Sequence, residues 1–177
     1  MSKTLTITIS KDAVIESIKG DTSITGNIDR SADPVKNAGV AYNEQAGNDA
    51  YHEKKIDRLV KTAISKFEAE IAEFTDGSIN DTATTDPDTH LTTITITMSV
   101  SDRYNAGLAK PLGGLAQSYI VNMALFGWWT SIKPDFAKGF ATMAADAIVY
   151  VRKCFAKNSP GTSTSSYDDV TGTVTNN

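Results

Sequence analysis

Histidine and cysteine, which most often supply zinc ligands and activated nucleophiles, are few in this chain. The chain has two histidines, His52 and His90, and a single cysteine, Cys154. A zinc site needs three or four ligands at short, characteristic spacings, and these residues are too few and too far apart. A nucleophilic cysteine needs a neighbouring base, and no histidine is near Cys154 in the sequence. We expect surface histidines, with His52 on the polar side of a helix, and a cysteine that acts as a small apolar side chain.

The acidic loop 76–90 contains Asp81, Asp86 and Asp88, whose oxygen atoms are of the kind that Ca²⁺ prefers. Their spacing is not that of an EF-hand, and the glycine that an EF-hand needs at its bend is missing. Aspartate is also frequent in turns because its side chain bonds to the backbone nearby. Whether this loop binds a cation stays open.

The glycine pair Gly113 and Gly114 comes before a predicted helix, as in phosphate-binding loops, but Lys110 precedes the glycines instead of following them. A bend or a close helix contact explains the pair better. The sequence therefore predicts no catalytic residues, no metal site and no cofactor, and a protein that is not an enzyme. The competing hypothesis is a small-ligand-binding protein or hydrolase with a pocket near His90.

Trp128 and Trp129 are our first candidates for a contact between subunits. Adjacent helical residues point about 100° apart, so both rings are buried only in a thick core or at an interface. Tryptophan is enriched among the residues that dominate binding at interfaces. We expect one ring in the core and the other at a subunit contact.

Composition and charge restrict the class of partner. The chain has 177 residues, enough for one domain, and a net charge of −4, which provides no general positive field for nucleic acid. The apolar stretch 112–129 approaches the length of a membrane span, but Gln117, Ser118 and Asn122 interrupt it. We expect a buried helix, protein partners and no membrane.

Hydrophobic periodicity predicts the elements. Residues 3–10 and 91–101 alternate between aliphatic and Thr or Ser residues, which indicates two half-buried strands that pair with each other. A helix of about two turns should follow Ser10 and end at Gly20, and a long polar loop should cover 20–50.

Apolar residues at three- and four-residue steps predict a helix over 51–74 and a helical hairpin of 112–132 and 134–157 packed on it. The expected fold is α+β and mainly helical, with three long helices and a small antiparallel β element in a single domain, 1–157. Residues 158–177 form a polar, extended tail in which only three residues offer anchors: Tyr167, Val170 and Val174.

The stretch 119–157, YIVNMALFGWWTSIKPDFAKGFATMAADAIVYVRKCFAK, resembles the C-terminal half of small virion proteins encoded by tailed phages and prophages of Bacteroides-type bacteria. Those proteins have an N-terminal Leu/Thr/Ile strand, a middle helix, an alternating strand and two helices joined through a Trp-centred segment. Their second helix ends in a basic run before a proline. The order is the same here, and the residues that match are Trp128, Trp129, Arg152, Lys153 and Pro160. The triplet Gly127-Trp128-Trp129 and the long Ser/Thr tail depart from the pattern.

This resemblance implies a structural protein of the virion that forms a homo-oligomeric ring in the head-to-tail connector, or neck, next to portal and tail components. A tail-completion or tail-terminator protein is the alternative. DNA would make only passive contact with the lumen of such a ring. The loops 20–50 and 75–90 and the tail would supply contacts between chains, and the tail would add a strand to a neighbour's strand 3–10 or 91–101.

Overall fold

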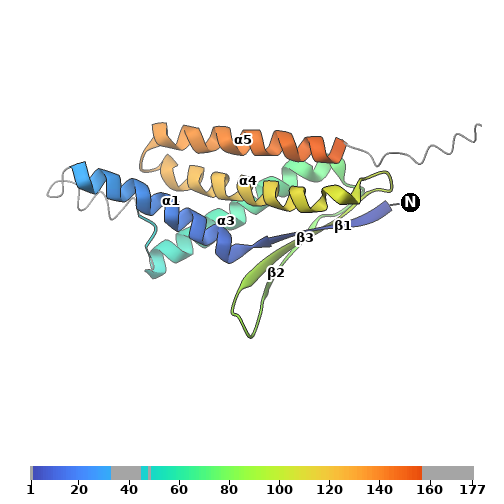
Figure 1. The fold of residues 1–177 in the computed structure, drawn as a ribbon, viewed down its shortest axis with the longest axis horizontal. Coiled ribbons are helices and arrows are strands. Elements are labelled where there is room, and N and C mark those ends of the chain that lie inside the picture. Colours follow the sequence, from blue (N-terminus) through green and yellow to red (C-terminus); the bar gives the residue numbers. More distant parts are fainter. Residues whose placement is uncertain (1, 33–44, 48, 157–177) are drawn as a thin grey trace, which may run out of the picture.

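The computed structural model describes residues 2–32, 45–47 and 49–156, and its fold is α+β. Four long helices and a small sheet make up this part of the chain, where we expected three long helices and one short one (Figure 1). The elements are, in chain order, β1 (Ser2–Ser10), α1 (Lys11–Ala32), α3 (Ala50–Ile71) with a 3₁₀ turn (Ala72–Phe74), β2 (Asn80–Thr85), β3 (Thr92–Ser101), a second 3₁₀ turn (Ala106–Leu108), α4 (Ala109–Thr130) and α5 (Pro134–Ala156).

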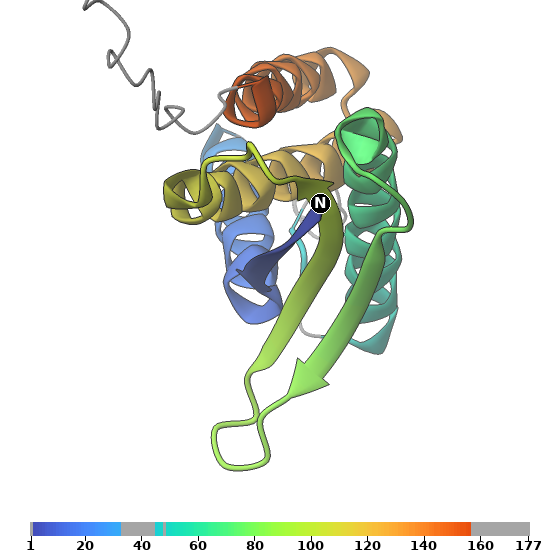
Figure 2. The ribbon, with the colours of Figure 1, turned by 90° about the vertical axis from the view of Figure 1, so that its right-hand side faces the viewer.

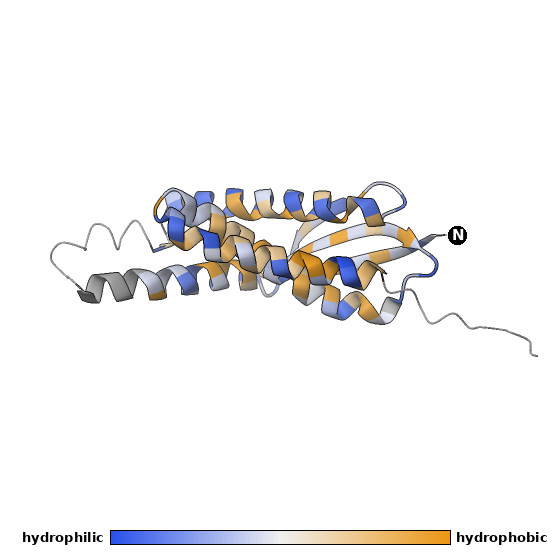
Figure 3. Ribbon diagram, turned by 90° about the horizontal axis from the view of Figure 1, so that it is seen from above, coloured by the Kyte–Doolittle hydropathy of each residue, from blue (hydrophilic) through white to orange (hydrophobic). Residues whose placement is uncertain are grey.

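The sheet is antiparallel with strand order β1-β3-β2, and the helices lie on one of its faces (Figure 2). Ile7 of β1 is opposite Ile96 of β3, so the predicted pairing of these two strands is confirmed. Aliphatic residues of both strands are buried under the helices, whereas the alternate Thr and Ser residues face outwards. Figure 3 shows this alternation in the colours along the strands.

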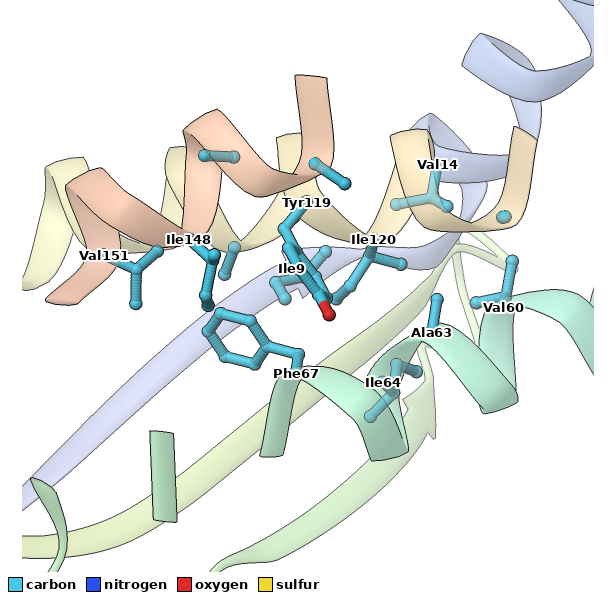
Figure 4. Close-up of a cluster of buried hydrophobic side chains, with 14 of the residues drawn as sticks. Ile9, Val14, Val60, Ala63, Ile64, Phe67, Tyr119, Ile120, Ile148 and Val151 are labelled. Atoms are coloured by element: carbon cyan, nitrogen blue, oxygen red, sulfur yellow. The ribbon is translucent and has the colours of Figure 1, made fainter. Parts of the chain in front are cut away.

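Helix α4 lies at the centre of the hydrophobic core and packs against α5, α3, β1 and α1. Its Tyr119 ring lies 5.7 Å from the Phe67 ring of α3, and Ile120 is completely buried beside Ile9 and Val60 in the same cluster (Figure 4). The predicted apolar face of the middle helix and the predicted helical hairpin are both confirmed.

Helix α1 is longer than the sequence suggested. Its start is as predicted, since the Ser10 hydroxyl accepts a hydrogen bond from Ala13 N–H, but the helix continues through Gly20 to Ala32. A glycine inside a helix costs only about 1 kcal/mol. Burial of Ile18 and Thr22 on either side of Gly20 offsets that cost, and the Thr22 hydroxyl also accepts from Ala46 N–H. Gly20 as a helix end was therefore wrong, as was the loop over 20–32. Residues 33–44 lie outside the described part.

Strand β2 occupies part of the segment that we expected to be a loop. Asn80–Thr85 pairs with β3, with Ala83 opposite Ile94, and all six of its residues are exposed. A strand that buries neither face shows no hydrophobic alternation, so periodicity did not predict β2. Helix α3 ends at Ile71, before Gly77, and Gly77 instead takes up a positive φ of 138° in the turn that leads to β2.

Candidate assembly surfaces

His52 is buried, and the prediction that it lies on the polar side of its helix was wrong. Asp49 caps α3 by accepting from the amides of Tyr51 and His52. The His52 Nδ1 lies 2.9 Å from the Gly47 amide nitrogen and 2.9 Å from an Asp49 carboxylate oxygen. On its other side the imidazole meets the Trp128 ring edge-on, at a centroid distance of 5.4 Å. These contacts fix the start of α3 and give His52 a structural role.

His90 is exposed in the turn between β2 and β3, with a positive φ of 57°. Its neighbour Asp86 uses its carboxylate to accept from the amides of Asp88 and Thr89, and these bonds lower the pKa of Asp86. Asp86 therefore stabilises the turn through its backbone contacts, which is the common role of aspartate in turns. An exposed turn of this kind offers a ligand no enclosure.

No group of three or more His, Cys, Asp or Glu residues that could hold a metal ion occurs in the described ranges. Cys154 is half-buried beside the core, in line with its predicted apolar role. Burial and, to a smaller extent, the nearby Cys154 raise the pKa of Tyr104 to about 12, so this phenol stays neutral at physiological pH.

Two carboxylates of α3 are shifted in opposite directions. Burial and the nearby Asp81 of β2 raise the pKa of Glu68. A hydrogen bond from Lys11, 2.6 Å long, lowers the pKa of Asp57, and an ion pair with Lys61 at 3.0 Å lowers it further. The Asp57 contacts tie α1 to α3 at the surface.

Both tryptophan rings are completely buried within the single chain. Trp128 lies against His52 and Trp129 lies edge-on to Phe136, at 5.1 Å. The expectation that one of them faces a partner was therefore wrong. Because α4 has neighbours on several sides, rings that point about 100° apart both find partners inside the chain.

Among the described residues, four of the exposed large apolar side chains, including Val149, lie on α5, whereas Ile24, Tyr51 and Leu91 are exposed elsewhere. Phe136, Met143 and Tyr150 are 43%, 48% and 57% exposed. They are seven residues apart, so they form one row along the helix, which we call the α5 row. Phe136 and Met143 belong to the three- and four-residue apolar steps that predict this helix, and the structure places both at the solvent-exposed margin of its buried face. The seven-residue spacing was visible in the sequence, but it does not reveal which chain provides the partner.

The second open feature is the outer edge of β2. β3 is the central strand and therefore has no free edge, contrary to our expectation that residues 91–101 offer one. The outer side of β1 has α4 beside it, where a Cβ on Gly113 would lie 3.6 Å from the Thr8 carbonyl oxygen. β2 remains as the exposed edge strand of the sheet.

The outward face of the sheet is uniformly polar and uncharged. By the pairing register, residues of β1, β3 and β2 form rows across it, such as Thr8, Thr95 and Thr82. Every residue on this face is Ser, Thr or Asn: Ser2, Thr4, Thr6, Thr8, Ser10, Asn80, Thr82, Thr84, Thr93, Thr95, Thr97, Ser99 and Ser101. This composition favours hydration and backbone pairing at the strand edge over a hydrophobic contact on the face.

The remaining predicted interface residues, Tyr167, Val170 and Val174, lie outside the described part of the chain. Within that part, no helix has the length and hydropathy that crossing a membrane requires. Comparisons of this chain with protein-family models, curated proteins and solved structures found no match.

Proposed function

We propose that this protein is a non-enzymatic structural subunit of a virion, which assembles with copies of itself into a ring in the head-to-tail connector of a tailed bacteriophage. The observation that carries the assembly part is the α5 row. Helix α5 packs one apolar face on α4 and leaves three large apolar side chains partly exposed in a row along the margin of that face, where another helix could pack.

The geometry of a ring follows from how such a contact repeats. A row on one copy that meets a different surface on the next copy makes a head-to-tail contact, and such contacts close into a ring when the rotation between copies fits. Many identical contacts of moderate strength then hold the ring together. The net charge of −4 favours protein neighbours, with DNA in at most passive contact with the lumen.

The position within a virion is supported by the sequence resemblance around Trp128, Trp129, Arg152 and Lys153, and by the matching order of elements. Portal and tail components are the neighbours that this position implies. Electron microscopy of particles that carry the labelled protein would locate it. A label in the capsid wall or at the distal tail tip would contradict the neck assignment.

A charge placed in the α5 row tests the assembly proposal. Met143→Lys should lower the assembled mass, because a lysine at the centre of a helix contact must be desolvated. Thr142→Lys is the matched control, because this substitution adds the same charge at an exposed residue. Thr142 points about 100° away from the α5 row. Mass photometry gives the oligomer size, and circular dichroism confirms that both variants are folded.

The expected result is a large assembly for the wild type and Thr142→Lys and smaller species for Met143→Lys. A wild-type chain that is monomeric at every concentration tested would contradict the ring, and equal masses for all three proteins would remove the α5 row from it.

A further inference from the structure

We infer that the outer edge of β2 accepts an extended strand from the C-terminal segment 169–175 of a neighbouring copy, which extends the sheet by one strand. This inference rests on the proposed assembly of identical chains, and it adds a second contact whose two halves lie on different parts of the chain. It concerns main-chain pairing, whereas the α5 row concerns side-chain packing.

The hydrogen bonds of the β2–β3 hairpin show which backbone groups face the open edge. The Asp86 N–H donates to the Leu91 carbonyl at 2.9 Å, and this pair continues the register in which Thr85 is opposite Thr92. In an antiparallel ladder, residues alternate between bonding to the partner strand and turning the same groups away. Thr82 and Thr84 therefore bond to β3, whereas Asp81, Ala83 and Thr85 turn their N–H and C=O groups outwards.

This edge carries few of the features that usually keep an exposed strand from pairing. Edge strands are commonly protected by short length, charged side chains, proline, a bulge or a covering helix. The sequence of β2, NDTATT, contains neither lysine nor proline, and all six residues are exposed. Its only charged side chain, Asp81, lies on the face of the sheet that carries Ile96, close enough to Glu68 to raise the pKa of that residue.

The segment DVTGTVT, residues 169–175, suits this edge. Its valines and threonines are β-branched and favour extended backbone, and it contains no proline or lysine. Small polar and aliphatic residues also fit a strand whose two faces stay in contact with water. Helix α5 ends at Ala156, and the residues between it and the segment span on the order of 40 Å when extended, which is enough to reach an adjacent copy.

A donor on one copy and an acceptor on the next make a head-to-tail contact, as a ring requires. Pairing of β2 with β2 of another copy would instead consume both edges in a closed dimer. The two arrangements differ in whether the C-terminal segment is needed, and full-length variants distinguish them.

The acceptor variant is Ala83→Pro. Proline removes an N–H that points away from β3, so the β2–β3 hairpin keeps its hydrogen bonds while the outer edge is blocked. Ala83→Val is the matched control, because it retains the N–H and raises β propensity. The donor variant is Thr173→Pro with Val174→Pro. These neighbours have opposite parity, so one of the two lost amides faces β2 in either register.

Each proline variant alone should lose the high-mass assembly in mass photometry, while Ala83→Val assembles like the wild type. In an equimolar mixture of the two proline variants the strand contact should form only between unlike chains, because each chain retains only one half of it. Chains carrying different affinity tags would verify that this contact joins one copy of each variant.

Normal assembly by the donor variant overturns the inference. This test is independent of Ala83→Pro, because the donor variant leaves the sequence of residues 2–156 unchanged. Normal assembly by a folded Ala83→Pro chain overturns it as well. If both proline variants assemble normally but Met143→Lys does not, the strand contact is contradicted and the ring proposal is supported. A wild-type chain that stays monomeric contradicts both the strand contact and the ring.

Discussion

Helices α4 and α5 lie antiparallel and side by side, are of nearly equal length and are both rich in apolar residues, yet they have different surroundings (Figures 1 and 2). The sheet, α1, α3 and α5 surround α4, which buries both tryptophans. Helix α5 packs mainly on α4 and leaves the α5 row exposed. The difference shows that apolar composition alone does not decide whether a helix is enclosed, because enclosure depends on what the rest of the chain places around it.

The difference extends to the glycines of the two helices. Gly127 of α4 faces α3, where an added Cβ would lie only 2.6 Å from a terminal methyl of Leu59. Gly139 of α5 has nothing within 4 Å of the same position. Gly127 thus allows α4 to lie close to α3. Gly139 allows no comparable contact of α5 with another element of the described chain.

The largest expected contrast comes from truncating one apolar side chain on each helix. Ile120→Ala should lower the free energy of unfolding by about 2–5 kcal/mol, because it leaves a cavity in a completely buried site. Met143→Ala should change it by less than about 0.5 kcal/mol, because the side chain is nearly half exposed. Urea unfolding at a protein concentration that keeps the chain monomeric measures both. Similar values for the two variants would contradict the comparison.

On α3, Phe67 is completely buried and Ile64 nearly so, in agreement with the apolar three- and four-residue steps that predicted this helix. Periodicity succeeded for α3, α5, β1 and β3 because in each of them a buried face and an exposed face leave a regular pattern in the sequence. Helix α4 was recognised mainly from an apolar stretch too interrupted by polar residues for a membrane span.

The sequence prediction failed where a contact between residues far apart in the sequence determined the structure, or where an element shows no hydrophobic periodicity. Gly20 looked like a helix end, but the hydrogen bond between Thr22 and Ala46 and the burial of Ile18 carry α1 beyond it. β2 buries no residue and so leaves no pattern. His52 looked polar because its burial depends on Trp128, which is far away in the sequence.

The candidate surfaces were harder to predict than the fold. Phe136 and Met143 fit a helical apolar stripe, and periodicity does not distinguish a partner in the same chain from one in another chain. The tryptophans were the better candidates by residue type alone, but the number of elements around α4 decided their burial. The open edge of β2 depends on strand order, which hydropathy does not encode.

Substituting alanine for each glycine should give effects of opposite sign. In Gly127→Ala the new methyl displaces Leu59, at a cost of about 1–3 kcal/mol, and the gain of up to about 1 kcal/mol in helix propensity offsets part of it. We expect a net loss near 1 kcal/mol. Gly139→Ala meets no neighbour and should stabilise the chain by about 0.5–1 kcal/mol.

Thermal unfolding of both variants, followed by circular dichroism, gives the signs directly. Gly114→Ala is a useful control on α4 itself, because its added Cβ would also lie in open space. It should behave like Gly139→Ala. If Gly127→Ala stabilises as much as the two controls, the contact between α3 and α4 is looser than the structure indicates.

The smallest expected effect concerns the polar connection between α5 and α3. The Arg152 guanidinium lies 2.6 Å from a Glu70 carboxylate oxygen and 3.8 Å from one of Glu73, and both partners are substantially exposed. Exposed ion pairs contribute about 0.2–1 kcal/mol and weaken as salt screens them. A double-mutant cycle with Glu70→Gln and Arg152→Met should therefore give a coupling energy in that range at low salt, which shrinks at high salt. A salt-independent coupling above about 2 kcal/mol would mean that this ion pair ties α5 to α3 more firmly than exposed pairs do. In that case α5 would be held by α3 as well as by α4, and the contrast with the enclosed α4 would be weaker.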